Sequence, residues 1–263
     1  MRRLALLTAA ALLAGCAATR PAIDTAALNI VDLTYPFDGQ TLYWPNSPSA
    51  FEMKQLAHGM TPGGYFYASN LFTAPEHGGT HLDAPIHFAE HGLTADAIPL
   101  QQLIAPAVVI DVAAQSAANA DYRLTAADVR AWEARNGAIA PGTIVLLRTG
   151  WGKRYPNRQQ YFGDDTPGAT DKLHFPSYGE EAARLLVGER HVAALGIDTA
   201  SIDYGQSTDF IVHRVAMGAN VPGFENVANL EKVPERGATV IALPMKIGGG
   251  SGGPLRIVAL LPK

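Results

Sequence analysis

The sequence predicts a single α/β domain, built as a mixed sheet or partly closed β-barrel flanked by helices. Three nearly continuous apolar runs, residues 107–112, 143–147 and 191–197, have the composition of strands that are buried on both faces. Two segments, 125–137 and 177–187, combine capping residues with apolar positions at helical spacing. No internal repeat or linker divides the 263 residues, a length suited to one large domain.

Shorter patterns predict the remaining elements. Apolar, β-branched or aromatic stretches favour strands at 29–33, 65–73, 239–243 and 255–261, and a turn of helix is expected near 99–103. Residues 248–253 form a glycine-rich segment between the last two strands. This segment lacks the Lys-Ser/Thr ending and the following helix of a phosphate-binding loop, so a hairpin connection is expected.

Both helix starts carry capping signals. Thr125 and Asp128 bracket the start of the first helix, and Gly137 ends it. Ser177 followed by Glu180 predicts a capping box for the second helix.

The N-terminus has the pattern of an export signal. Arg2 and Arg3 precede residues 4–13, a run that is apolar except for one threonine. Such a run is too short to span a bilayer but suits the central region of a signal peptide. The next residues, Leu-Ala-Gly-Cys ending at Cys16, resemble a bacterial lipoprotein box. The alternative is an ordinary signal peptide with an incidental cysteine.

The N-terminal pattern sets the expected organisation of the chain. Residues 1–15 are expected to be a signal peptide, residues 16–27 a lipidated tether, and residues 28–263 the folded domain. Cys16 is the only cysteine, so no internal disulfide can form. We therefore expect an exported protein in the periplasm or at the cell surface, attached to a membrane only through a lipid on Cys16.

Composition and charge exclude other classes. The apolar fraction of 48% and the charged fraction of 17% fit an ordinary globular protein. The formal net charge is −4, and no Lys/Arg cluster occurs beyond the extreme N-terminus. Since nucleic-acid binding depends on a basic surface, no nucleic-acid partner is expected.

One short segment concentrates the chemistry. His77, His81, Asp83 and His87 are separated by intervals of 4, 2 and 4 residues. On an extended chain, even spacing directs all four side chains to one face, and intervening glycines and a proline disfavour a helix. Imidazole nitrogens and a carboxylate are ligands for Zn²⁺ or Mn²⁺ in open sites. The alternative is a set of ordinary polar residues on an exposed strand, but three of only eight histidines gather here.

A second pair lies far downstream. His213 and Glu225 flank a turn-rich stretch, residues 217–223. On spacing alone, a histidine and a glutamate twelve residues apart carry little information.

The segment from His77 to Phe88 resembles the H-x-G-T-H-x-D-x-P-x-H signature of the cyclase family, which includes bacterial kynurenine formamidases and isatin hydrolases. Every signature position is filled. Further family-like segments cover most of the chain after residue 29, and these are Leu33-Thr34, Trp44-Pro45, Gly196-Ile197-Asp198-Thr199 with Ser201 and Asp203, His213, and Glu225-Asn226.

The resemblance implies a set of metal ligands. His77, His81 and Asp83 would hold a first divalent ion. Asp83 and Glu225 would bridge to a second ion, and His213 would be that ion's own ligand. The metal is zinc in the family's formamidases and manganese in its isatin hydrolases, so either metal is expected here, with two ions per chain.

The resemblance also implies other roles. His87 would be the proton donor and acceptor, and the alternative that it is itself a ligand stays open. Trp44 would contact the substrate. Asp198, Ser201 and Asp203 would support the site rather than react.

The implied activity is hydrolysis of a C–N bond in a small amide, such as the linear formamide N-formylkynurenine or the cyclic amide isatin. A divalent metal lowers the pKa of bound water from about 15.7 to roughly 7, which supplies a nucleophile at neutral pH. The expected export signal departs from the family's kynurenine formamidases, which generally lack one. The alternative function is a metal- or ligand-binding lipoprotein without turnover. The resemblance further implies a homodimer or higher homo-oligomer.

Overall fold

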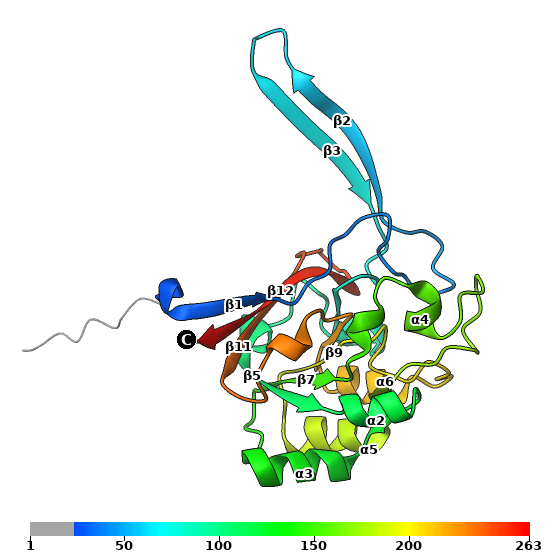
Figure 1. The fold of residues 1–263 in the computed structure, drawn as a ribbon, viewed down its shortest axis with the longest axis vertical. Helices are drawn as coiled ribbons and strands as arrows, with labels where there is room; N and C mark the ends of the chain where they lie inside the picture. Colours follow the sequence, from blue (N-terminus) through cyan, green and yellow to red (C-terminus); the bar gives the residue numbers. More distant parts are fainter. Residues whose placement is uncertain (1–23) are drawn as a thin grey trace, which may run out of the picture.

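Seven strands close into a mixed β-barrel in the computed structural model, which describes residues 24–263 (Figure 1). The strand order is β12-β11-β5-β7-β9-β10-β4, and β4 pairs back with β12. The bounds are β4 His81–Asp83, β5 Ile104–Asp111, β7 Ile144–Arg148, β9 Ala194–Ile197, β10 Gly223–Glu225, β11 Ala238–Pro244 and β12 Gly252–Pro262. A further strand, β1 (Leu28–Asp32), extends the sheet along β12. The predicted α/β fold with a barrel is confirmed, and the barrel is closed rather than partly closed.

The three apolar runs are strands that are buried on both faces, as predicted. β5, β7 and β9 are parallel neighbours. Val109 and Leu146 belong to the apolar cluster that fills the barrel, together with Phe224 of β10. Val108 and Val145, one position earlier in each strand, belong to the cluster under the helices. Because neighbouring strand residues point to opposite faces, a strand covered on both sides has no polar alternation.

Helices cover the outer face of these strands, and these are α3 (Ala126–Asn136), α5 (Glu180–Arg184, with a π-helical continuation Leu185–Glu189) and α6 (Ile211–Gly218) (Figure 1). The other helices are α1 Leu100–Leu103, α2 Ala113–Ala118 and α4 Arg158–Phe162. Short 3-10 turns occupy Thr25–Ala27, Pro85–His87, Trp151–Arg154 and Leu230–Lys232. The predicted capping box of Thr125 and Asp128 starts α3.

The predicted capping box at Ser177 is wrong. Ser177 lies in β8 (Ser177–Tyr178), which pairs in parallel with β6 (Arg123–Leu124). Its hydroxyl donates to the backbone oxygen of Tyr178, and the residue that caps α5 is Gly179. Pairing with β6 holds Ser177 extended, so its hydroxyl is too early in the chain to cap the helix.

A two-stranded arm, β2 (Glu52–Met60) and β3 (Phe66–Thr73), projects from the body (Figure 1). The strand predicted near residues 65–73 is confirmed, whereas β2 had no predicted counterpart. The arm pairs only with itself, and a register shift between Gln55 and Ala57 interrupts its ladder. Its exposed large apolar side chains are Met53, Leu56, Met60, Tyr65, Phe66, Tyr67, Leu71 and Phe72.

The remaining predictions concern the glycine-rich segment near the C-terminus and the export signal at the N-terminus. The glycine-rich segment 248–253 lies at the turn between antiparallel β11 and β12, as the hairpin prediction requires. The expected signal peptide, residues 1–15, and the expected lipid site, Cys16, lie outside the described residues. The expected tether is described only from residue 24. Among residues 24–263, no helix has the length and apolar character needed to cross a membrane.

Candidate metal centre

The histidine-rich segment and the downstream pair meet in one cavity of about 250 Å³. β4 and β10 are antiparallel neighbours there, and their pairing places Glu225 opposite His81. His213 comes from α6, and His77 and His87 come from the bends on either side of β4. Residues more than a hundred positions apart in the sequence therefore line a single space.

The predicted extended geometry of the histidine-rich segment is only partly correct. His81 and Asp83 share one face of β4, but this strand is only three residues long. Gly79, at φ +55°, turns the chain before β4 in a conformation that favours glycine, and a Cβ there would lie 2.8 Å from the Phe37 ring. Beyond β4, His87 lies in a 3-10 turn. The side chains converge through bends rather than through even spacing along one strand.

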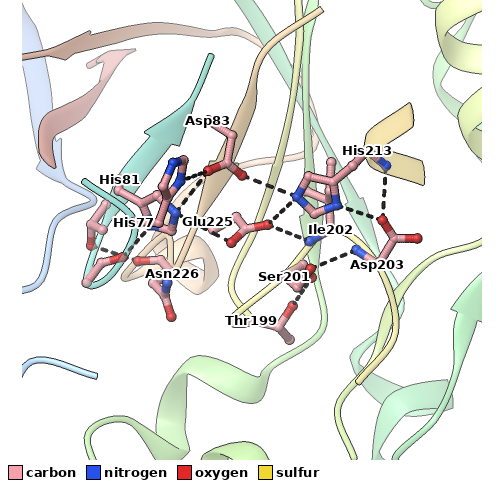
Figure 2. Close-up of polar contacts among 12 residues, drawn as sticks. His77, His81, Asp83, Thr199, Ser201, Ile202, Asp203, His213, Glu225 and Asn226 are labelled. Atoms are coloured by element: carbon pink, nitrogen blue, oxygen red, sulfur yellow. Dashed lines mark hydrogen bonds and ion pairs between the residues drawn. The ribbon is translucent and has the colours of Figure 1, made fainter. Parts of the chain in front are cut away.

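His81 presents one nitrogen to two carboxylates (Figure 2). Its Nε2 lies 3.1 Å from Asp83 Oδ1 and 3.6 Å from Glu225 Oε2. Its Nδ1 lies 3.0 Å from the Gly79 backbone oxygen, which fixes the ring from behind. Backbone contacts of this kind set the tautomer and orientation of metal-binding histidines.

His213 also presents one nitrogen to Asp83 and Glu225, from the side opposite His81 (Figure 2). Its Nε2 lies 3.3 Å from Glu225 Oε1 and 3.4 Å from Asp83 Oδ2. Its Nδ1 lies 2.6 Å from Asp203 Oδ2. Asp203 also accepts from the backbone nitrogens of Val212 and His213, in the first turn of α6. One buried carboxylate thus stabilises the start of the helix and aims its histidine.

His77 is held by the glycine-rich hairpin. Its Nδ1 lies 2.6 Å from Asp83 Oδ1, and its Nε2 lies 2.9 Å from Ser251 Oγ. Ser251 in turn donates to Glu76 through its backbone nitrogen and its hydroxyl, at 3.0 and 2.6 Å. Sequence reasoning missed Ser251 and Glu76, because neither occurs in a recognisable metal motif.

These donors fit a divalent metal ion. His77, His81 and His213 each have one nitrogen fixed by the protein and the other directed at carboxylates. Buried Asp83 Oδ2 has no hydrogen-bond partner among the described residues. Potential ligand atoms cluster within 4.8 Å in two groups that share Asp83, namely His81, Asp83 and Glu225, and His77, Asp83 and His87. Nitrogen and carboxylate donors of this number suit Zn²⁺ or Mn²⁺.

The electrostatics of the centre favour added positive charge. Burial raises the pKa of Glu225, and the neighbouring Asp83 carboxylate raises it further. Burial alone would lower the pKa of His81, but Asp83 and Glu225 outweigh it and raise that pKa to about 9. Two carboxylates buried side by side therefore stabilise the protonated forms of the groups in the cavity. A divalent cation would neutralise the same negative charge.

His87 differs from the other three histidines of the centre. Its ring stacks on that of His77 at a centroid distance of 3.8 Å. No described residue forms a hydrogen bond with its ring, and its side chain is exposed. Desolvation by the surrounding protein lowers the pKa of His87, a shift that this exposure limits. The position leaves a ring nitrogen free to exchange a proton.

The cavity walls are largely aromatic. Trp44, the predicted substrate contact, lines the cavity and is half-buried. Its ring meets those of Phe162 and Phe175 edge-on, at 6.3 and 6.2 Å. Sequence reasoning missed the other aromatic walls, which are Tyr43, Phe88, Phe162 and Phe210. Their contribution depends on tertiary folding and has no local sequence signal.

Comparison with known proteins agrees with this geometry. Residues 31–204 match the family model for Cyclase. This chain belongs to the cyclase family. The matched range contains the segment from His77 to His87, and the fold adds His213 and Glu225 from beyond it.

Relatives of this cyclase-family chain carry hydrolase names. Isatin hydrolase of Roseibium aggregatum is 37% identical over 209 residues, covering 76% of this chain and 77% of the relative. Kynurenine formamidase of Sphingopyxis alaskensis is 30% identical and covers 87% and 96%. The structure of isatin hydrolase A from Ralstonia solanacearum gives a TM-score of 0.82 at 36% identity, covering 90% and 93%.

Proposed function

We propose that this chain hydrolyses the C–N bond of a small amide in the cavity lined by residues of β4, β10 and α6, with a divalent metal as cofactor. The observation that carries this proposal is the pair of buried carboxylates, Asp83 and Glu225, faced by anchored imidazoles. A bound ion would supply the Lewis acidity that activates water and polarises a carbonyl. The relatives named isatin hydrolase and kynurenine formamidase support an amide as the substrate.

We propose His77, His81, Asp83, His213 and Glu225 as the metal ligands. Asp83 Oδ1 faces His77 and His81 while its Oδ2 faces His213, and Glu225 likewise faces both His81 and His213, which supports two ions per chain. Zinc and manganese both suit this donor set. Metal analysis of the purified protein, followed by chelation and reconstitution with each ion, tests metal identity and number.

We propose that His87 exchanges the proton with the leaving nitrogen. Its exposed ring at the cavity and its lack of a described hydrogen-bond partner support this role over that of a ligand. His87→Ala should keep the metal content and lower turnover by about 100-fold or more, whereas Asp83→Ala should lose metal and activity together. Equal metal loss in the two variants would assign His87 to the metal instead.

We propose isatin as a better substrate than N-formylkynurenine. Within residues 24–263, no lysine or arginine lines the cavity, so these residues offer no cationic partner for the α-carboxylate of N-formylkynurenine. The aromatic walls, with Trp44 among them, suit a planar uncharged ring.

The test of the reaction is an assay of the metal-loaded protein on isatin, N-formylkynurenine and a panel of amides and lactones. We expect turnover that a chelator abolishes and added Zn²⁺ or Mn²⁺ restores. A higher kcat/KM on N-formylkynurenine would overturn the substrate preference alone. Tight metal binding without turnover on any panel member would overturn the enzymatic proposal and favour a binding protein.

We propose that the chain is exported and attached to a membrane by a lipid on Cys16. The short apolar run before Leu-Ala-Gly-Cys supports this location. Metabolic labelling with a radioactive fatty acid should mark the wild-type protein and not Cys16→Ser. Cys16→Ser should also leave the membrane fraction, and label retained by that variant would contradict the lipid site.

We propose that the arm, β2 and β3, binds a second copy of this chain. Its eight exposed apolar side chains each leave about 100 Å² uncovered. The total, on the order of 800 Å², matches one partner's share of a standard interface. A hairpin covered on neither face is only marginally stable alone, which also favours a partner.

Light scattering at rising protein concentration tests the assembly. The wild-type chain should form a dimer or higher oligomer, and Phe66→Ser on the arm should weaken it. Ile30→Ser, a matched change of an exposed apolar residue on β1, should not. A wild-type chain that stays monomeric at high concentration would contradict the proposal.

A further inference from the structure

The side chain of Asn226 lines the cavity, although a residue directly after a cavity-lining strand residue would normally point to the opposite face. It follows Glu225, the last residue of β10, and side chains alternate between the two faces of a strand. Asn226 breaks this alternation because its backbone is left-handed, with φ +53°. Both Glu225 and Asn226 consequently line the same cavity.

The backbone of Asn226 is fixed on both sides. Its nitrogen donates to the Thr199 oxygen at 2.8 Å, and its own oxygen accepts from Thr80 Oγ1 at 2.7 Å. Thr80 lies next to His81, so this bond ties the position to β4. Only 3% of the Asn226 surface is exposed, which leaves the side chain little freedom.

The side-chain amide of Asn226 is anchored at one end only. The Tyr161 hydroxyl, 2.9 Å from Asn226 Oδ1 and 3.1 Å from the Asp198 backbone oxygen, shares its single hydrogen between the two. No described residue accepts a hydrogen bond from Asn226 Nδ2, and this atom is not among the fully enclosed polar atoms without a partner. The amide nitrogen therefore reaches the surface of the cavity that Asn226 lines.

Two other asparagines show that a left-handed backbone alone does not require this arrangement. Asn220 and Asn229 also have positive φ, at 56° and 55°. Asn220 is exposed, and its Oδ1 accepts from the Leu93 backbone nitrogen. Asn229 donates to the Asp32 oxygen and accepts from Lys232. Of the three, only Asn226 combines near-complete burial with an amide donor left for the cavity.

We propose that Asn226 Nδ2 donates a hydrogen bond to the carbonyl oxygen of the scissile amide and stabilises the negative charge that develops there. The inference rests on the proposed amide hydrolysis. A donor that is fixed before the substrate arrives needs no reorganisation during the reaction, and loss of one such donor lowers kcat by about 100- to 1,000-fold in other hydrolases.

Asn226→Gly is the decisive variant. Glycine keeps the left-handed backbone without strain and removes only the amide. We expect kcat/KM on isatin to fall by about 100-fold, mainly through kcat, at wild-type metal content. Asn220→Gly makes the same change at an exposed left-handed position, and it should keep wild-type kinetics.

Asn226→Asp gives a second, independent test. Its carboxylate can still accept from Tyr161 but has no N–H for the substrate, so a comparable fall is expected. Wild-type kcat/KM in either Asn226 variant would overturn the inference, as would a loss of activity explained by an equal loss of metal. A wild-type enzyme without turnover on any amide fails the proposed function itself, whereas any of these outcomes beside an active wild type fails this inference alone.

Discussion

The barrel and the β2–β3 arm are both rich in apolar residues, yet the barrel buries these side chains and the arm exposes them to solvent. In β7, Val145 and Leu146 are completely buried. On the arm, Met60 and Phe66 are 69% and 58% exposed. The strands of the closed barrel have neighbours at both edges, and β7 is packed on both faces, whereas the arm pairs only with itself.

The difference in burial corresponds to different functions that we expect for the barrel and the arm. All the residues that line the cavity of the candidate metal centre belong to the barrel, its connecting loops, α4 and α6, and none of the arm's strand residues is among them. Changes in the barrel should therefore act on folding, metal and turnover. Equivalent changes on the arm should act on assembly.

The largest effect is expected from one substitution made in both regions, Glu225→Gln in the barrel and Glu52→Gln on the arm. Glu225 lies within 3.6 Å of both His81 and His213, so losing its charge should weaken metal binding by more than about 100-fold and abolish activity. Exposed Glu52 should be neutral in both respects. Metal content and rate, measured in parallel, check the pair. Loss of metal in Glu52→Gln would contradict the expectation that the arm does not contribute to the metal centre.

The next largest effect is expected on the free energy of unfolding, when a phenylalanine is replaced in the barrel and on the arm. Phe224→Ala empties a completely buried site in the barrel core and should lower the free energy of unfolding by about 3–5 kcal/mol. Phe66→Ala on the exposed arm should change it by no more than about 0.5 kcal/mol in dilute, unassociated protein. Denaturant unfolding monitored by circular dichroism gives both values. A similar loss in both variants would show that the arm folds as part of the core.

The same contrast explains what the sequence could predict of the fold. The runs at 107–112 and 143–147 were recognisable because strands buried on both faces are continuously apolar. β2 has Lys54, Gln55 and Gly59 among its apolar residues and is buried on neither face, so no period marks it. The start of α6 is stabilised by Asp203, eight residues upstream, and such a distant partner lies outside any local capping pattern.

The candidate metal centre was also predictable only in part from the sequence. His77, His81, Asp83 and His87 lie close enough in sequence for their clustering to stand out, although bends rather than one extended strand bring them together. The roles of His213 and Glu225 followed only from the family resemblance. Ser251 reaches His77 from 174 positions away, through the pairing of β4 with β12, and nothing local indicates this.

A smaller effect tests how far the centre extends into the barrel. Asp203→Asn keeps the shape of the side chain but removes the charge that orients His213, so metal affinity should weaken by about 10- to 100-fold. Asp209→Asn, at an exposed position nearby, is the matched control and should keep wild-type affinity. Competition with a chromogenic chelator measures both affinities. An unchanged affinity in Asp203→Asn would limit the role of Asp203 to starting α6.

The smallest effect lies on the helical side of the barrel, where Arg190 Nε contacts Glu133 at 2.8 Å. The hydrogen bond from Arg190 holds the pKa of Glu133 below its ordinary value of 4.5. A lowered carboxyl pKa means that the folded state binds the proton less readily than the unfolded state. The pair therefore stabilises the fold above pH 4.5, by about 0.5–1 kcal/mol at this partly exposed site, and the gain disappears as pH falls through the lower folded pKa. Glu133→Gln should flatten this part of the pH–stability curve, measured by denaturant unfolding, whereas Glu52→Gln on the arm should not. Curves of equal slope for wild type and Glu133→Gln would show that the contact contributes nothing, and the barrel and the arm would then be alike in their surface charges.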